Sequence, residues 1–259
     1  MNDLTVFFFD HIIYIYFFYG LAFFSLGLTL HSARSHDSTF RFAGAIGLLA
    51  LFGYLHGIHE WVEMVGEINR RSGGQMAVSF EAGRLLLLIL SFAALIAFGA
   101  RLLAPAEAGF WRRYAIVGLL LALWGAAVAA LALARSYTGY ELIAAADVMA
   151  RYLLAIPGSL LAAWMLMAQQ RTFREQQLSR FGRNLVWCAL ALILYGGVSQ
   201  MFVRPADFLP ANLLNSQSFL AWFGIPVQLF RAVLAIIITV YMVRALRVFD
   251  VENRRRLDE

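Results

Sequence analysis

The chain has 259 residues, of which 61% are hydrophobic and only 14% are charged, with a mean hydropathy of +0.70. A soluble domain carries about 25% charged residues, so the composition excludes an ordinary soluble protein. The net charge of +5 comes from arginine alone, because the sequence contains no lysine. The missing lysine excludes a retinal protein of the usual kind, which needs one for its Schiff base, and the single Cys188 excludes a disulfide framework or a cysteine-cluster metal site.

Apolar stretches follow one another along the chain, each near the roughly 20 residues that a membrane helix needs. The predicted spans are about 5–31, 42–65, 80–103, 114–134, 142–168, 184–203 and 224–248. The first is too long for the apolar part of a signal peptide, so we expect it to remain as a membrane helix. The sequence therefore predicts an all-α integral membrane bundle of seven transmembrane helices over residues 1–248, followed by the start of a cytoplasmic helix over 249–259.

Arginines in the links between spans predict the orientation of the bundle. Links two, four and six hold four arginines, namely Arg70, Arg71, Arg135 and Arg204. Links one, three and five and the tail hold twelve, namely Arg34, Arg41, Arg112, Arg113, Arg171, Arg174, Arg180, Arg183, Arg247, Arg254, Arg255 and Arg256. This bias places the N-terminus outside and the C-terminus in the cytoplasm of a bacterial inner membrane. Because topology accounts for the arginine excess, we expect the lipid bilayer as a partner and no nucleic acid.

Ionisable side chains gather in the outer halves of five predicted spans. They are Asp10 and His11 in the first span, His56, His59, Glu60 and Glu63 in the second, Glu81 and Arg84 in the third, Asp147 and Arg151 in the fifth, and Arg231 in the seventh. Such groups inside a membrane normally face the protein interior and have partners. We therefore expect one polar site in the bundle core that opens to the outside.

Part of this set also has a simpler interpretation. Asp147 and Arg151 are four residues apart and Glu81 and Arg84 are three apart, so each pair could be an intrahelical ion pair at the membrane edge. Long arginine side chains can also reach the interface from inside the membrane. Arg231 and Arg151 lie farther from the ends of their spans, which favours a buried role for both.

His56, His59 and Glu60 share one helix face, and three interpretations of the two histidines stay open. They could be hydrogen-bonded core residues. They could bind a cofactor, either a transition metal (copper, zinc or iron) with His11 as a further ligand, or a haem b with arginines at its propionates. They could also titrate directly as a proton sensor. The order of residues differs from the HExxH pattern of metalloproteases, because the carboxylate follows the second histidine.

The last span runs into a charged segment with apolar residues at helical spacing, including Leu246, Phe249 and Leu257. This pattern predicts a helix that leaves the membrane and pairs as a coiled coil in a homodimer. The alternative is a simple anchor whose arginines meet anionic lipid.

Several segments carry a resemblance to a known class. Residues 18–27 (FYGLAFFSLG), 52–61 (FGYLHGIHEW), 151–161 (RYLLAIPGSLL), 224–232 (GIPVQLFRA) and 244–250 (RALRVFD) resemble the seven-helix input regions that precede bacterial histidine kinases and diguanylate cyclases. The resemblance covers nearly the whole chain. It implies a sensory domain that relays ligand binding to a cytoplasmic output domain in cis. The chain itself has no kinase or cyclase motif, so enzymatic activity is expected only from such an output domain.

Two other functions remain open from the sequence. A small-solute transporter would need a polar path through both leaflets, and the inner halves of the spans lack polar residues. A b-type cytochrome that carries electrons across the membrane would want haem ligands on both sides, whereas the histidines inside the predicted spans lie on the outer side.

Overall fold

The computed structural model describes residues 3–33, 41–105, 107–175 and 179–258, with the backbone alone for 41, 179, 180 and 248–258. Within these ranges the chain forms helices and one isolated β-bridge between Val203 and Asn215, and no strand. The elements in chain order are α1 (Asp3–Asp10), α2 (Ile12–Ser32), α3 (Arg41–Arg71), α4 (Val78–Leu103), α5 (Phe110–Arg135), α6 (Gly139–Ala150), η1 (Arg151–Ala155), α7 (Ile156–Glu175), α8 (Ser179–Leu192), η2 (Ile193–Val198), η3 (Ser199–Met201), α9 (Ser216–Phe223) and α10 (Val227–Asp258).

Among the described residues, seven helical segments are long and apolar enough to cross a membrane, which confirms the predicted all-α architecture. Five spans are single helices: α2, α3, α4, α5 and α10. The fifth span joins α6, η1 and α7, and the sixth joins α8, η2 and η3. The predicted orientation of the bundle stays a prediction, because length and composition do not distinguish the two sides.

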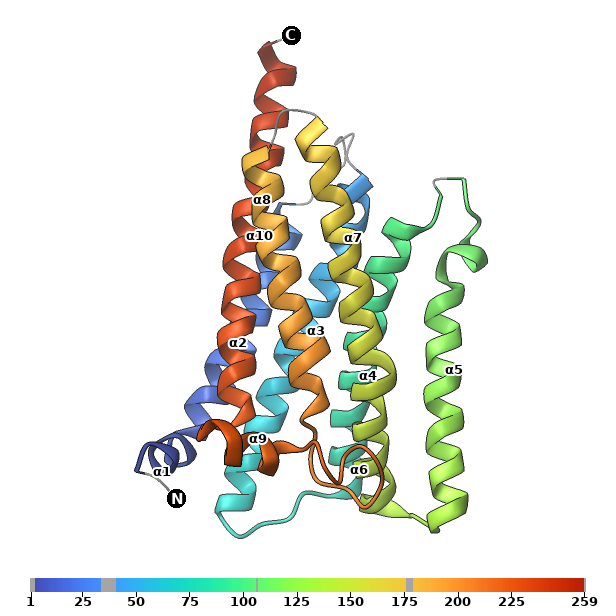
Figure 1. Ribbon diagram of the computed structural model, residues 1–259, viewed down its shortest axis with the longest axis vertical. Coiled ribbons are helices and arrows are strands. Elements are labelled where there is room, and N and C mark those ends of the chain that lie inside the picture. Colours follow the sequence, from blue (N-terminus) through green and yellow to red (C-terminus); the bar gives the residue numbers. More distant parts are fainter. Residues whose placement is uncertain (1–2, 34–40, 106, 176–178, 259) are drawn as a thin grey trace.

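The first predicted span is not one helix. It breaks at His11, so that α1 ends at Asp10 and α2 begins at Ile12. Figure 1 shows α1 turned away from α2 at the lower end of the bundle. The hydroxyl of Thr5 donates to the carbonyl of Gly224 at 2.7 Å, which fastens α1 to the segment before α10.

The core lies among α2, α3, α4, α7, α8 and α10, which pack against one another in sequence around the bundle (Figure 1). Helix α5 packs at the edge, against α4, α6 and η1. None of the residues in its most apolar stretch is fully buried. Helix α5 therefore covers the outside of the bundle beside α4 and α6.

Two pairs of glycines bring α2 and α3 close together. A Cβ atom on Gly53 would lie 2.7 Å from the nitrogen of Gly27, and one on Gly57 would lie 2.7 Å from the carbonyl oxygen of Gly20. Small residues allow this close approach between membrane helices. Because His56 lies between the two glycines of α3, the same contact holds its ring near α2, 6.2 Å from the ring of Tyr19 between centroids.

Helix α10 is longer than the membrane. Its 32 residues span about 48 Å at 1.5 Å per residue, against a hydrocarbon core of about 30 Å. In Figure 1 its C-terminal part extends beyond the other helices at the upper end of the bundle. The helix therefore connects the interior of the bundle with the space beyond one membrane face.

Candidate functional site

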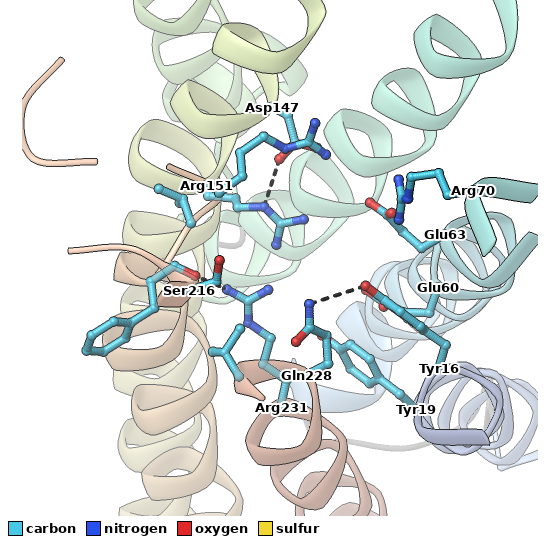
Figure 2. Close-up of a pocket in the computed structure, with 14 residues that line it drawn as sticks. Tyr16, Tyr19, Glu60, Glu63, Arg70, Asp147, Arg151, Ser216, Gln228 and Arg231 are labelled. Atoms are coloured by element: carbon cyan, nitrogen blue, oxygen red, sulfur yellow. Dashed lines mark hydrogen bonds and ion pairs between the residues drawn. The ribbon is translucent and has the colours of Figure 1, made fainter. Parts of the chain in front are cut away.

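A polar cavity lies where α3 ends and α10 begins (Figure 2). These helix ends lie at the end of the bundle away from the C-terminal part of α10 (Figure 1). Its volume is about 250 Å³. Its walls come from α2, α3, α6, η1, α9, α10 and the segment after η3. The lining residues are Tyr16, Tyr19, Glu60, Glu63, Arg70, Asp147, Arg151, Phe202, Val203, Arg204, Ser216, Val227, Gln228 and Arg231.

A network of ion pairs forms one side of this cavity. The Arg84 guanidinium, 2% exposed, binds Glu63 and lies 2.9 Å from both Glu81 and Asp147. Asp147 also accepts a hydrogen bond from Nε of Arg151 at 2.9 Å. The intrahelical pairs that the spacing allowed are both present, and they are joined across helices into one buried network. Arg84 is therefore a core residue and does not reach the interface.

The side chain of Arg151 extends the network to the sixth span. Its Nη1 donates to Oε1 of Gln200 at 2.8 Å. Arg151 begins the π-helical segment η1, which ends two residues before Pro157. A proline lacks an N–H and its ring crowds the preceding turn, which accounts for a local widening of the helix here. Such π segments frequently occur at functional sites, and this one sets the position of Arg151 in the cavity wall.

His56 lies deeper, with both ring nitrogens bonded. The Ser91 hydroxyl donates to the carbonyl of Leu88 at 2.7 Å, so it accepts from Nδ1 of His56 at 3.0 Å. The neutral imidazole then uses Nε2 to accept from the hydroxyl of Tyr195 at 2.6 Å. Tyr195 in turn accepts from the hydroxyl of Tyr19 at 2.7 Å. This hydrogen-bond chain runs from the cavity wall at Tyr19 through η2 to α3 and α4.

His59 has one bonded and one free ring nitrogen. Its Nδ1 donates to the carbonyl of Arg84 at 3.1 Å, which leaves Nε2 as the acceptor of a neutral ring. Nε2 is buried and has no hydrogen-bond partner in the part of the chain that the structure describes. The nearest carboxylate oxygens belong to Glu60 at 4.0 Å and Glu63 at 3.8 Å. This corner therefore brings Nε2 of His59 close to the carboxylates of Glu60 and Glu63.

Arg231 of α10 lies across the cavity from Glu60 (Figure 2). It is 6% exposed and donates to Ser199 and Phe202: Nε to the Ser199 hydroxyl at 3.3 Å, and Nη2 to the two carbonyl oxygens at 2.8 and 3.0 Å. No carboxylate among the residues that the structure describes lies within 4.0 Å of it. Arg231 is thus buried in the protein with its charge uncompensated by an ion pair.

The segment after η3 forms the wall of the cavity at this end of the bundle. The nitrogen of Ser216 donates to the carbonyl of Val203 at 2.7 Å, and Asn215 caps α9 through the nitrogens of Gln217 and Ser218. These bonds fix the backbone at Ser216, which lines the cavity. This wall is therefore an ordered part of the fold.

The structure brings together most of the predicted site residues but not those of the first span. Glu60, Glu63, Asp147, Arg151 and Arg231 line the cavity, while His56, His59, Glu81 and Arg84 lie behind its wall. Asp10 and His11 are exposed, at the break between α1 and α2. His11 bonds the carbonyl of Phe7 at 2.8 Å and stacks on the ring of Phe7. The structure therefore places His11 outside the cavity, which corrects its predicted role as a further ligand.

The residues do not fit the metal or haem sites considered above. His56 has no free ring nitrogen, and its ring is packed against Phe23, Phe52 and Phe92 with centroids 4.9, 5.2 and 5.3 Å away. A porphyrin could not reach it without displacing these rings. No group of three or more histidine, cysteine or acidic side chains in the described ranges is arranged to hold a metal ion. The geometry favours hydrogen-bonded core histidines.

The sequence reasoning did not identify the tyrosines. Tyr16 and Tyr19 line the cavity, and Tyr195 binds His56. A buried tyrosine hydroxyl usually has a hydrogen-bond partner, so Tyr16 and Tyr19, three residues apart on one face, were a usable signal. Nothing in the sequence indicated that the partner of Tyr19 would be 176 residues away.

No protein-family model, curated protein or solved structure matches this chain.

Proposed function

We propose that this chain is a membrane-embedded sensory input domain that binds a small polar solute in its cavity and relays the binding through α10. The observation that carries the proposal is the position of Arg231. Its guanidinium lines the cavity without a carboxylate partner, on the same continuous helix whose other end extends past the bundle. Ligand contacts to Arg231 therefore act directly on the helix that leaves the membrane.

The energetics support a coupling between the cavity and α10. A buried charge without an ionic partner costs several kcal/mol, even after relaxation. Arg231 is held by carbonyl oxygens of Ser199 and Phe202, both at the end of the sixth span. An anionic ligand group would draw the guanidinium toward the cavity and change how α10 sits against that span. A ligand shifts such an equilibrium only through different affinities for the two states.

A second contact path supports the same proposal. Tyr19 lines the cavity and begins the hydrogen-bond chain through Tyr195 and His56 to Ser91. The chain links α2, η2, α3 and α4. Occupancy of the cavity can thus bias the packing of several spans together with α10.

In the proposed arrangement the cavity opens to the outside and α10 enters the cytoplasm, where it pairs in a homodimer and controls a kinase or cyclase domain in cis. The support for this is the arginine distribution and the resemblance described above. Metal and haem are not part of the proposal, because the histidines lack the required geometry.

The distribution of buried polar side chains favours a receptor over a transporter. Ser91 and Ser159 lie near the middle of their spans. In the half of the bundle beyond them, the buried side chains of the described ranges are apolar, including Leu26, Leu30 and Ile46. A polar solute has a binding site at one end but no polar path to the other.

The test is a fusion of a diguanylate cyclase or kinase output after Glu259, reconstituted in vesicles. We expect output to change when the probe solutes named in the next section are added, and Arg231→Gln to abolish the response. Arg135→Gln is the matched control, since Arg135 is an exposed arginine outside the cavity. Uptake of a probe into vesicles without any change in output would instead support transport.

A further inference from the structure

Two groups of opposite charge in the cavity, Glu60 and Arg231, form no ion pair between a carboxylate and a guanidinium among the described residues. Glu60 is 3% exposed, and no arginine in the described ranges lies within 4.0 Å of its carboxylate. Arg231 likewise has no carboxylate within that distance. The remaining charges on this side are engaged: Glu63 and Asp147 with Arg84, Arg151 and Arg204 with Asp147, and Arg70 with Glu67. Glu60 and Arg231 are therefore the two charged groups of the cavity that a charged ligand could pair with.

These two groups lie on different walls. Glu60 comes from α3 and Arg231 from α10, and Figure 2 shows Gln228 between them. Nε2 of Gln228 donates to the hydroxyl of Tyr16 at 3.3 Å, while its carbonyl oxygen makes no hydrogen bond among the described residues. The space between the two charges thus has a further acceptor along its side.

We infer that the cavity binds a small zwitterion, a molecule with one ammonium and one carboxylate group. The inference deepens the proposed function by naming the ligand class, and it rests on that proposal only in taking the cavity as the ligand site. The carboxylate would bind Arg231, whose Nη1 makes no hydrogen bond within the described part of the chain. The ammonium would bind Glu60.

The surroundings of Glu60 suit an ammonium. Its Oε1 lies 3.4 Å from Nε2 of His56 and 4.0 Å from Nε2 of His59. In the neutral rings the hydrogen sits on Nδ1 of each, so Nε2 of His59 is a free acceptor, whereas Nε2 of His56 already accepts from Tyr195. The Glu60 carboxylate and Nε2 of His59 therefore offer acceptors to an ammonium, which supplies three donors. The rings of Tyr16 and Tyr19 line the same wall and provide aromatic surface of the kind that cations favour.

A ligand with a single charge would compensate only one of the two unpaired groups in the cavity. A cation at Glu60 would leave Arg231 without an ionic partner, and an anion at Arg231 would leave Glu60 unpaired. A molecule with both groups compensates both. The volume of about 250 Å³ lies just below the range of about 300–1,000 Å³ that holds drug-sized ligands, which restricts the zwitterion to a small one.

The test measures binding of five probes to the purified full chain by calorimetry and by thermal stabilisation. Glycine, β-alanine and 4-aminobutyrate carry the two charges at increasing separation. Propionate and propylamine each keep one charged group of β-alanine. We expect at least one of the three zwitterions to bind at least tenfold more tightly than both singly charged probes.

Two variants test the assigned partners. In Glu60→Gln we expect the best zwitterion to bind at least tenfold more weakly and to lose its preference over propionate. In Arg231→Gln we expect the same loss, with the preference over propylamine removed. Arg135→Gln and Glu141→Gln, which change exposed residues outside the cavity, should leave binding unchanged. Each variant should lose the preference over a different singly charged probe. Misfolding cannot produce this pattern, because it would weaken the binding of all probes alike.

The inference would be overturned if propionate or propylamine bound as tightly as the best zwitterion. It would also be overturned if none of the five probes bound. The outcomes for the two proposals are distinguishable. Zwitterion binding without any change in a fused output would keep the ligand class and remove the sensory function. Output that responds equally to propionate alone would keep the sensory function and remove the ligand class.

Discussion

The carboxylate of Asp147 lies 2.9 Å from Nη1 of Arg84 and joins α6 to α4 inside the bundle. Both side chains are almost fully buried, and the other Asp147 oxygen lies 2.9 Å from Nε of Arg151. One acidic side chain therefore lies within ion-pair distance of three guanidiniums, those of Arg84, Arg151 and, at 3.9 Å, Arg204. It is the central member of the ion network beside the cavity.

Replacing Asp147 should strongly destabilise the bundle. Asp147→Asn keeps the size of the side chain but removes the charge that faces Arg84 and Arg151. Removing one partner of a buried pair typically costs about 3–5 kcal/mol, because the other charge is left uncompensated. We expect a lower midpoint of thermal unfolding in detergent. The matched control is Asp207→Asn, which changes an exposed pair with Arg135 and should leave the midpoint nearly unchanged. Equal effects of the two variants would contradict the central role of Asp147.

The hydroxyl of Tyr195 should stabilise the fold through His56. In Tyr195→Phe, Nε2 of His56 and the hydroxyl of Tyr19 both lose their partner in a buried site. Leaving buried polar groups unbonded costs about 1–3 kcal/mol each. Thermal unfolding of Tyr195→Phe, His56→Phe and the double variant checks this, with exposed Tyr14→Phe as control. Additive losses in the double variant would show that the two residues are not coupled.

The contact between α2 and α3 should be intolerant of a single methyl group. A Cβ on Gly53 would lie 2.7 Å from the backbone nitrogen of Gly27, so Gly53→Ala forces the helices apart. Overpacking of this kind typically costs about 1–3 kcal/mol. Gly83→Ala is the matched control, because nothing lies within 4 Å of its Cβ and alanine favours a helix by about 0.5–1 kcal/mol. Thermal unfolding should move down for the first variant and stay or rise for the second.

Contacts between the link after α5 and Asp207, outside the spans, should make the stability of the fold depend on pH. Tyr137 donates a hydrogen bond to Asp207, and Arg135 lies 3.2 Å away. The hydrogen bond from Tyr137 and then the charge of Arg135 lower the pKa of Asp207 below its ordinary value. Because the folded-state pKa is the lower one, this stabilisation is present above the unfolded pKa of about 3.9 and is lost as the pH falls through the folded value. Tyr137→Phe should raise the pKa of Asp207 in an NMR titration, and an unchanged value would contradict the assignment.

The predicted orientation can be checked with single cysteines. Cys188 is buried, so background labelling by a membrane-impermeant maleimide should be low. Ser72→Cys lies in the link after α3 and Glu107→Cys in the link after α4, and both positions are exposed. With the N-terminus outside, Ser72→Cys should react in intact cells and Glu107→Cys only after permeabilisation. The reverse pattern would place the cavity on the cytoplasmic side.

Local properties of the sequence were sufficient for the spans and for part of the site. Hydropathy over about 20 residues identifies a membrane helix whatever its neighbours are, because the bilayer acts on each segment separately. The cost of buried charge likewise indicated a polar interior. Five charged groups of the cavity wall, Glu60, Glu63, Asp147, Arg151 and Arg231, were among the residues that this cost singled out.

Only the tertiary structure decided which side chains meet. His11 lies at the break between α1 and α2 and is therefore outside the site. The hydrogen-bond chain to His56 depends on the contact between Tyr19 and Tyr195, which are 176 residues apart. The bonding of both His56 nitrogens argued against a cofactor, although its spacing with His59 allowed one. Hydrogen-bond partners depend on how helices rotate and pack, and that rotation is set by contacts such as Gly53 against Gly27 between separate spans. A single sequence reports the depth of each group but not the direction in which it faces.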